Sequence, residues 1–281
     1  MGVYPSEDAK QTKNLHGVHF VLPLICILYI LSPIITSMSD IIEGRNPVLE
    51  LLKAGRSINK ILLASNVQRH SVIAEILNLA KSKGTPVEFV DESVIRRLSF
   101  TAASQGIIAY VSPKEYVTLD DLLVISKSKN EPPLYCVLDG IEDPQNLGAI
   151  LRTADATGFH GIVVRERRAV GLTPIVAKAS AGAIEYVPVA RVANISQAIE
   201  FLKKANVWVI GVDMAGRTEY SKVDYKLPTA IVIGNEGAGL SDLVRNRCDT
   251  ITSIPMKGKI SSFNASVATA IVMYEAFRQR R

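Results

Sequence analysis

Hydrophobic positions change their spacing several times along the chain, and the changes define two α/β regions. From residue 38 to about 111, short apolar runs alternate with apolar residues at helical spacing. Pro47 favours the first turn of a helix, Gly84 favours the end of another, and Asp91 is expected to cap a third. The predicted elements are a helix from 46, a strand at 58–64, a helix at 71–83, a strand at 86–90, a helix at 91–98 and a strand at 106–111. This alternation predicts a small α/β domain at 38–111.

A polar segment at 112–133, punctuated by prolines, is interpreted as a linker that contains a short helix at 119–125. Beyond it, strands and helices alternate again. The predicted strands are 134–138, 161–164, 207–212, 229–233 and 251–254, and the predicted helices are 147–157, 174–181, 195–204 and 264–278. Region 134–281 is therefore predicted to be a second α/β domain, with a mostly parallel sheet covered on both faces.

Residues 1–37 do not continue either pattern. Residues 20–35 are almost wholly apolar, but the run is shorter than the ~20 residues of a spanning helix, and Pro23 and Pro33 interrupt it. Three interpretations stay open: a signal-like segment, a membrane anchor through residues 18–37, and an extension that precedes a true start at Met38. We favour the start at Met38 and expect a cytoplasmic protein without a stable membrane partner.

The composition of the chain limits which partners and which kinds of site are expected. The 281 residues are 48% hydrophobic, enough for a sizeable core, and a formal net charge of +5 favours a polyanionic partner. The cysteines Cys26, Cys136 and Cys248 form no disulfide framework and no metal pair, which is typical of a reducing compartment. The four histidines lack metal-ligand spacing, so we expect no metal.

Three polar segments directly follow predicted strands, where α/β sheets bind ligands. The segment 233–240 carries three glycines, but their spacing is G-x-x-G-x-G and not that of a dinucleotide loop, and a tight turn is the alternative. In segment 139–154, Asn146 is either a helix cap or a functional amide. Arg152 lies among small and apolar residues and is either solvent-exposed or bound to an anion. In segment 254–277, a loop rich in hydroxyl groups leads into an apolar helix, capped by Ser262 or Asn264.

Together the three segments resemble the SpoU/TrmH family of RNA ribose 2′-O-methyltransferases, in the SPOUT superfamily. Asn-Leu-Gly-Ala-Ile-Leu-Arg-Thr-Ala (146–154), Ile-Gly-Asn-Glu-Gly-Ala-Gly-Leu (233–240) and 254–270 correspond, in order, to the three motifs of the family. Glu-Gly-Arg-Asn-Pro-Val (43–48) resembles the start of its L30e-like substrate-binding domain. The branch that methylates a guanosine of bacterial large-subunit ribosomal RNA is the most similar one, and transfer RNA is the alternative substrate.

The resemblance implies a deep trefoil knot in the C-terminal domain, S-adenosylmethionine as cofactor without a metal, and a homodimer. It assigns catalysis to Arg152, with Asn146, Glu236 and Asn264 organising the site. Arg45, Asn46 and Arg152 would bind RNA. The implied cofactor-binding residues are Gly234, Asn235, Gly239, Ile254, Met256, Phe263 and Ser266. Two residues depart from the family pattern, because Phe263 replaces a frequent leucine and Ser104 a frequent histidine. A non-catalytic RNA-binding or ribosome-assembly factor is the alternative from another functional class.

Overall fold

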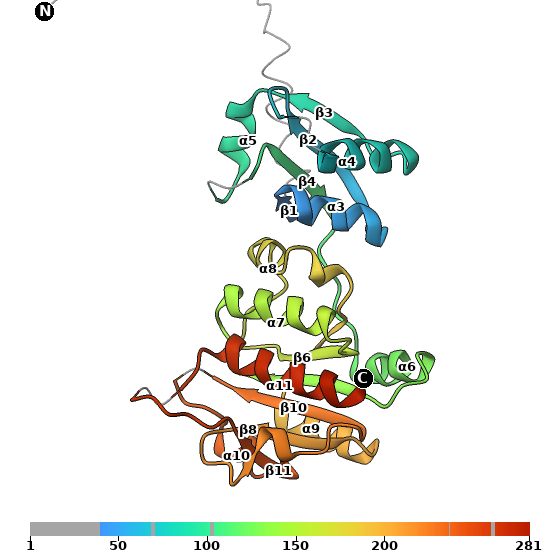
Figure 1. Ribbon diagram of the computed structural model, residues 1–281. Helices are drawn as coiled ribbons and strands as arrows, with labels where there is room; N and C mark the ends of the chain where they lie inside the picture. Colours follow the sequence, from blue (N-terminus) through green and yellow to red (C-terminus); the bar gives the residue numbers. More distant parts are fainter. Residues whose placement is uncertain (1–39, 69–70, 102–103, 236, 260–261) are drawn as a thin grey trace, which may run out of the picture. The chain divides into compact units, whose positions relative to one another are not determined.

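The computed structural model describes residues 40–68, 71–101, 104–235, 237–259 and 262–281 (Figure 1). These residues belong to one compact unit. Residues 1–37, for which three interpretations were given, lie outside the described residues. In the part that the structure describes, no helix is both long enough and apolar enough to cross a membrane.

The N-terminal domain contains a four-stranded sheet in the order β1-β4-β2-β3. Its strands are β1 (Asp40–Glu43), β2 (Ile58–Ala64), β3 (Val87–Val90) and β4 (Ile107–Val111). Strand β4 is antiparallel to both of its neighbours, and β2 and β3 are parallel. Alternate strand residues pack on helices α3 (Arg45–Ala54) and α4 (Ser71–Ser82) or on α5 (Glu92–Leu98). Asp91 caps α5 by accepting a hydrogen bond from the Ser93 N–H at 2.8 Å, which confirms that prediction.

The C-terminal domain contains a seven-stranded sheet in the order β7-β6-β5-β10-β8-β11-β9. Every neighbouring pair in it is parallel, so the prediction of a mostly parallel sheet is confirmed. The strands are β5 (Leu134–Asp139), β6 (Gly161–Arg165), β7 (Val189–Val192), β8 (Trp208–Val212), β9 (Thr218–Glu219), β10 (Thr229–Gly234) and β11 (Thr250–Ser253). Strands β7 and β9 were not predicted.

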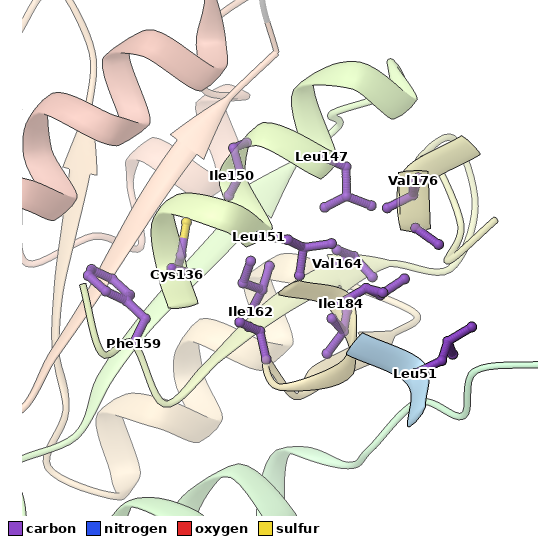
Figure 2. Close-up of a cluster of buried hydrophobic side chains, with 14 of the residues drawn as sticks. Leu51, Cys136, Leu147, Ile150, Leu151, Phe159, Ile162, Val164, Val176 and Ile184 are labelled. Carbon is purple, nitrogen blue, oxygen red and sulfur yellow. The ribbon is translucent and has the colours of Figure 1, made fainter. Parts of the chain in front are cut away.

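Helices cover both faces of this sheet, because successive strand residues point to opposite sides. One face packs on α7 (Pro144–Ala156) and α11 (Ala265–Arg280), and α8 (Pro174–Ala179) packs on α7. Figure 2 shows Leu151 of α7 among Cys136, Ile162 and Val164 of the sheet. The other face packs on α6 (Leu119–Ser128), α9 (Ile195–Lys204) and α10 (Asp242–Arg245). Two 3₁₀ turns, η1 (Ala183–Glu185) and η2 (Tyr220–Lys222), complete the domain.

Two local predictions need correction. The helix expected within the linker is longer than predicted, and its Leu122 is buried in the core of the C-terminal domain, where the Tyr135 hydroxyl donates a hydrogen bond to the Leu122 carbonyl at 3.0 Å. Helix α7 begins at Pro144, and Asp143 caps it by accepting hydrogen bonds from the backbone N–H groups of the next two non-proline residues. Asn146 is therefore not the cap of α7, and its side chain instead accepts a hydrogen bond from Asn264.

Two close backbone approaches occur near the carboxyl ends of β8 and β10, one within the loop after β10 and one between the loop after β8 and strand β11. A Cβ atom on Gly234 would lie 2.1 Å from the carbonyl carbon of Gly239, and one on Gly216 would lie 2.4 Å from that of Thr252. Side chains other than hydrogen would not fit at these two positions. The trefoil knot stays a prediction, because strand order and pairing do not define how one loop threads another.

The contact between α7 and α8 predicts the effect of Gly148→Ala on stability. Alanine normally stabilises a helix relative to glycine by ~1 kcal/mol. Here the added Cβ would lie 2.3 Å from the Cβ of Ala179 and 2.8 Å from its carbonyl carbon. We therefore expect Gly148→Ala to lower the free energy of unfolding by about 1–3 kcal/mol in urea denaturation. Gly237→Ala is the control, because its nearest neighbour would be 3.7 Å away. Equal or greater stability of Gly148→Ala would contradict the packing described.

Candidate functional site

Three loops and the start of α11 enclose a cavity of about 310 Å³ at the carboxyl edge of the larger sheet. Its wall combines apolar side chains with polar groups of the backbone and of a few side chains. The lining residues come from β8 and its following loop (Val212, Asp213, Met214), from β10 and its loop (Ile233, Gly234, Asn235, Gly237, Ala238, Gly239), and from Arg245, Ile254, Met256, Ser262, Phe263, Ala265 and Ala268. A cavity of this size and mixed lining is typical of a site for a small organic ligand.

The loop after β10 is closed on itself by two backbone hydrogen bonds. The Asn235 N–H donates to the Gly239 carbonyl at 3.0 Å, and the Gly239 N–H donates to the Asn235 carbonyl at 2.9 Å. The Asn235 side chain donates to the Gly140 carbonyl at 2.8 Å, which ties this loop to the end of β5. Asp139, also at the end of β5, accepts hydrogen bonds from Ser241 N–H and hydroxyl groups. These contacts give the cavity a wall with a defined backbone conformation.

A partly buried ion pair, Asp213–Arg245, forms another part of the wall, with 2.7 Å between the carboxylate Oδ2 and the guanidinium Nη2. Burial alone would raise the pKa of Asp213. Hydrogen bonds from the Ala215 N–H and from Arg245 outweigh that effect and hold the pKa of Asp213 below its usual value. Asp213 is therefore ionised at neutral pH, and Arg245 is its counter-ion. Neither residue was predicted as part of the site.

Asn264 connects the beginnings of α11 and α7. Its Oδ1 caps α11 by accepting hydrogen bonds from the Ser266 N–H at 3.0 Å and the Val267 N–H at 3.3 Å, so the cap is Asn264 and not Ser262. Its Nδ2 donates to the Oδ1 of buried Asn146 at 3.1 Å. The structure thus brings together two of the predicted catalytic residues, which lie 118 positions apart in the sequence.

Arg152 lies in a different hollow, an open groove of about 810 Å³ between α7 and α11. Its side chain is exposed and forms no ion pair or hydrogen bond with any residue that the structure describes. The groove is otherwise mostly small and apolar, and its walls include Ala149, Val267, Ala270, Ile271 and Tyr274. An unpaired guanidinium on such a surface can bind an anionic group from another molecule.

Most predicted cofactor residues line the cavity. Gly234, Asn235, Gly239, Ile254, Met256 and Phe263 do so. Ser266 does not: it lines the groove of Arg152, because its hydroxyl donates to Asn264 Oδ1 at 2.6 Å within the α11 cap. Glu236 lies outside the described residues. Among the residues described, no cluster of His, Cys, Asp and Glu could hold a metal ion.

The N-terminal domain has its own polar hollow of about 580 Å³. Arg45 lines it and is held to Gln105 by two hydrogen bonds, one of which joins the Arg45 N–H to Gln105 Oε1 at 3.0 Å. Ser104 lines the same hollow. Asn46, the other residue predicted to bind RNA in this domain, is exposed but is not part of the wall.

Two family models match the chain. The model of the SpoU rRNA methylase family matches residues 133–274, and the model for RNA 2′-O ribose methyltransferase substrate binding matches residues 41–117. A protein of Bacillus subtilis (strain 168), provisionally named a TrmH family tRNA/rRNA methyltransferase, is 44% identical over 241 residues, which are 86% of this chain and 96% of that protein.

Solved structures show the same fold. The SpoU methyltransferase AviRb from Streptomyces viridochromogenes, in complex with the cofactor AdoMet, is 27% identical and has a TM-score of 0.73. The match covers 87% of this chain and 92% of that one. An AdoMet-bound rRNA methyltransferase from Sinorhizobium meliloti is 28% identical with a TM-score of 0.71, over 86% of this chain and 88% of the other.

Asn264 both caps α11 and donates to Asn146, and these two roles predict that its substitutions will differ. Asn264→Ala removes the cap of α11, and we expect the free energy of unfolding to fall by about 0.5–2 kcal/mol. Asn264→Asp keeps a capping oxygen but removes the amide donor to Asn146, so its stability should be closer to that of the original protein. Urea denaturation of both variants measures the difference. Equal losses would show that the cap does not determine the effect.

Proposed function

The chain belongs to the SpoU/TrmH family of RNA methyltransferases, and on this premise we propose that it methylates the ribose 2′-hydroxyl of a guanosine in large-subunit ribosomal RNA. S-adenosylmethionine (AdoMet) supplies the methyl group. The observation that carries the proposal is the cavity formed by the loops after β8, β10 and β11, beside a groove that contains Arg152.

The residues of the cavity suit AdoMet. Ile233, Ile254, Met256 and Phe263 provide apolar surface for an adenine ring, and the backbone of the β10 loop provides polar groups for its edges. The Nε atom of Arg245 is buried and has no hydrogen-bond partner among the described residues. A buried donor without a partner is unfavourable, and an acceptor atom of a bound ligand would satisfy it.

AdoMet would supply an electrophilic methyl group on a sulfonium. As the bond from the 2′-oxygen to the methyl carbon forms and the carbon–sulfur bond breaks, the hydroxyl proton would pass to water or to a phosphate of the RNA. The residues of this chain therefore have to position the attacking hydroxyl and stabilise its developing charge. The guanidinium of Arg152 is a poor base in water, and its role is to orient the ribose and to stabilise the negative charge that develops on the 2′-oxygen. The hydrogen-bonded pair Asn146–Asn264 fixes the start of α7, and with it the helix that carries Arg152.

Ribosomal RNA is our first choice of substrate, because the matching family model is that of an rRNA methylase. The N-terminal domain would bind this RNA through its polar hollow, with Arg45 and the exposed Asn46 as contacts. With such a substrate we also propose a cytoplasmic location. Transfer RNA is the second candidate, since the relative from B. subtilis carries both substrates in its name.

We further propose that two copies form a homodimer through the α7–α11 groove. Val267 and Tyr274 are 46% and 60% exposed there, although both are large and apolar or aromatic. Exposed apolar surface of this kind is typical of a protein interface. Because Arg152 lies in the same groove, each copy would complete the substrate site of its partner.

The experiment that tests the function transfers a labelled methyl group from AdoMet to unmodified rRNA and tRNA. Alkaline cleavage of RNA requires a free 2′-hydroxyl, so a methylated ribose gives one linkage that resists hydrolysis. We expect label in large-subunit rRNA and one resistant linkage after a guanosine. Label on a base would refute ribose methylation, and label confined to tRNA would favour the second candidate.

Removing the Arg152 guanidinium should abolish methyl transfer and leave cofactor binding intact. We expect Arg152→Ala to reduce kcat by about 10²–10³-fold, the usual cost of losing one group that stabilises developing negative charge. AdoMet affinity, measured by titration calorimetry, should not change, because Arg152 does not line the cavity. Arg247→Ala is the control, since Arg247 pairs with Glu200 outside both hollows. Near-normal turnover of Arg152→Ala would remove this residue from the mechanism.

Charge on the groove surface should separate the two copies. We expect the double variant Val267→Glu, Tyr274→Glu to be a monomer in light scattering and to lose methyl transfer. Val124→Glu is the matched control, because Val124 is 64% exposed on α6, which covers the other face of the sheet. If the unsubstituted protein is a monomer at micromolar concentration, this would contradict the proposed homodimer.

A further inference from the structure

The ion pair between Asp213 and Arg245 has no part in the mechanism above, although both residues line the cavity. The Asp213 side chain is only 10% exposed, and that of Arg245 is 35% exposed. Burying an ion pair is energetically expensive, because neither charge keeps its full hydration. Stability alone therefore does not account for this ion pair, and its place in a ligand cavity suggests that it binds a ligand.

The hydrogen bonds of the pair leave specific atoms available. Asp213 Oδ1 accepts from the Ala215 N–H at 2.9 Å, and Oδ2 accepts from Arg245 Nη2 at 2.7 Å. The Leu240 N–H also contributes a hydrogen bond to the carboxylate, which has about four acceptor positions, so one position stays available. On the other side, the buried Arg245 Nε has no partner among the described residues. The pair thus offers an unused donor on its cation and one unused acceptor position on its anion, and both residues line the cavity.

The other acidic group near Arg245 does not replace Asp213 as its counter-ion. Asp242 Oδ1 lies 3.7 Å from Arg245 Nη1, but the Asp242 side chain is 94% exposed. Interactions of such an exposed carboxylate are strongly screened by water. The guanidinium also stays charged, because the hydrogen bond that it donates to Asp213 raises the pKa of Arg245.

We propose that the Asp213–Arg245 pair binds the amino-acid end of AdoMet, an inference that rests on the proposed use of this cofactor. Arg245 donates to the carboxylate through its Nε, and Asp213 accepts from the ammonium group. The carboxylate of the ligand then faces Arg245 and its ammonium group faces Asp213, so that each of the four charges lies next to one of opposite sign. The adenine then occupies the apolar part of the wall, formed by Ile254, Met256 and Phe263.

Two probes separate this role from a structural one. 5′-Methylthioadenosine lacks the whole amino-acid end of AdoMet, and decarboxylated AdoMet lacks only the carboxylate. We would measure the Kd of AdoMet and of both probes by titration calorimetry, for the original protein and for Arg245→Gln and Asp213→Asn. Arg247→Gln is the matched control, because this neighbouring arginine is 49% exposed and does not line the cavity.

We expect Arg245→Gln to weaken AdoMet binding by about 10- to 100-fold, the range for a hydrogen bond between charged groups. Binding of 5′-methylthioadenosine and of decarboxylated AdoMet should change less than about twofold. Asp213→Asn should weaken AdoMet and decarboxylated AdoMet, which both carry the ammonium group, and leave 5′-methylthioadenosine unaffected. Arg247→Gln should bind all three ligands like the original protein.

Equal weakening of AdoMet and 5′-methylthioadenosine by Arg245→Gln would overturn the proposal, because the pair would then act on the shape of the cavity. Unchanged AdoMet binding in both variants would overturn it as well. If a single substitution unfolds the protein, the double variant Asp213→Asn, Arg245→Gln leaves no uncompensated charge and must show the same selective loss of AdoMet. If the unsubstituted protein binds neither AdoMet nor 5′-methylthioadenosine, this would refute the proposal that AdoMet is the cofactor.

Discussion

The parallel direction of all seven strands in the larger sheet is the constraint on which the candidate site depends. It brings the carboxyl ends of β8, β10 and β11 to one edge, so loops that begin at residues 213, 235 and 254 become neighbours. At Gly234 and Gly216 these loops meet backbone atoms so closely that no Cβ would fit. Several glycines line the cavity beside apolar side chains, and at these positions the wall is backbone.

Strongly patterned elements could be predicted from the sequence, and the outcome for short strands was mixed. Helix α9 and strand β2 were predicted with the bounds that the structure shows, since each spans several repeats of its hydrophobic pattern. Of the four-residue strands, β3 and β11 were predicted and β1 and β7 were not. The sequence left Asn146 open as a helix cap or a functional amide, and the structure gives the cap of α7 to Asp143. Pro144 could have indicated this, because proline is favoured in the first helical turn.

The site residues divide in a similar way. Gly234 and Ile254 could be named as residues of the site from the sequence, because they lie in the segments that resemble the family. Asp213 could have been found, since it directly follows a predicted strand at the ligand-binding edge. Arg245 could not, because several acidic residues lie near it in sequence and only the fold selects Asp213 as its partner. Ser266 lines the groove and not the cavity, because its hydroxyl belongs to the cap of α11, and its role in cofactor binding stays a prediction.

Asn264 explains how two separate hollows can serve one reaction. Its amide joins the start of α11, next to the cavity, to Asn146 at the start of α7. Arg152 follows Asn146 by six residues, which places it about 9 Å further along the same helix. The distance from the cavity to the guanidinium is thus fixed by one rigid element and not by a flexible loop. Among its described residues a single chain provides no free anion for Arg152, because the carboxylate that lines the groove, Glu275, is paired with Arg278. In the proposed function, a phosphate of the RNA substrate, brought into a groove completed by a second copy, would supply the missing charge, so substrate binding and assembly of the catalytic site would become one event.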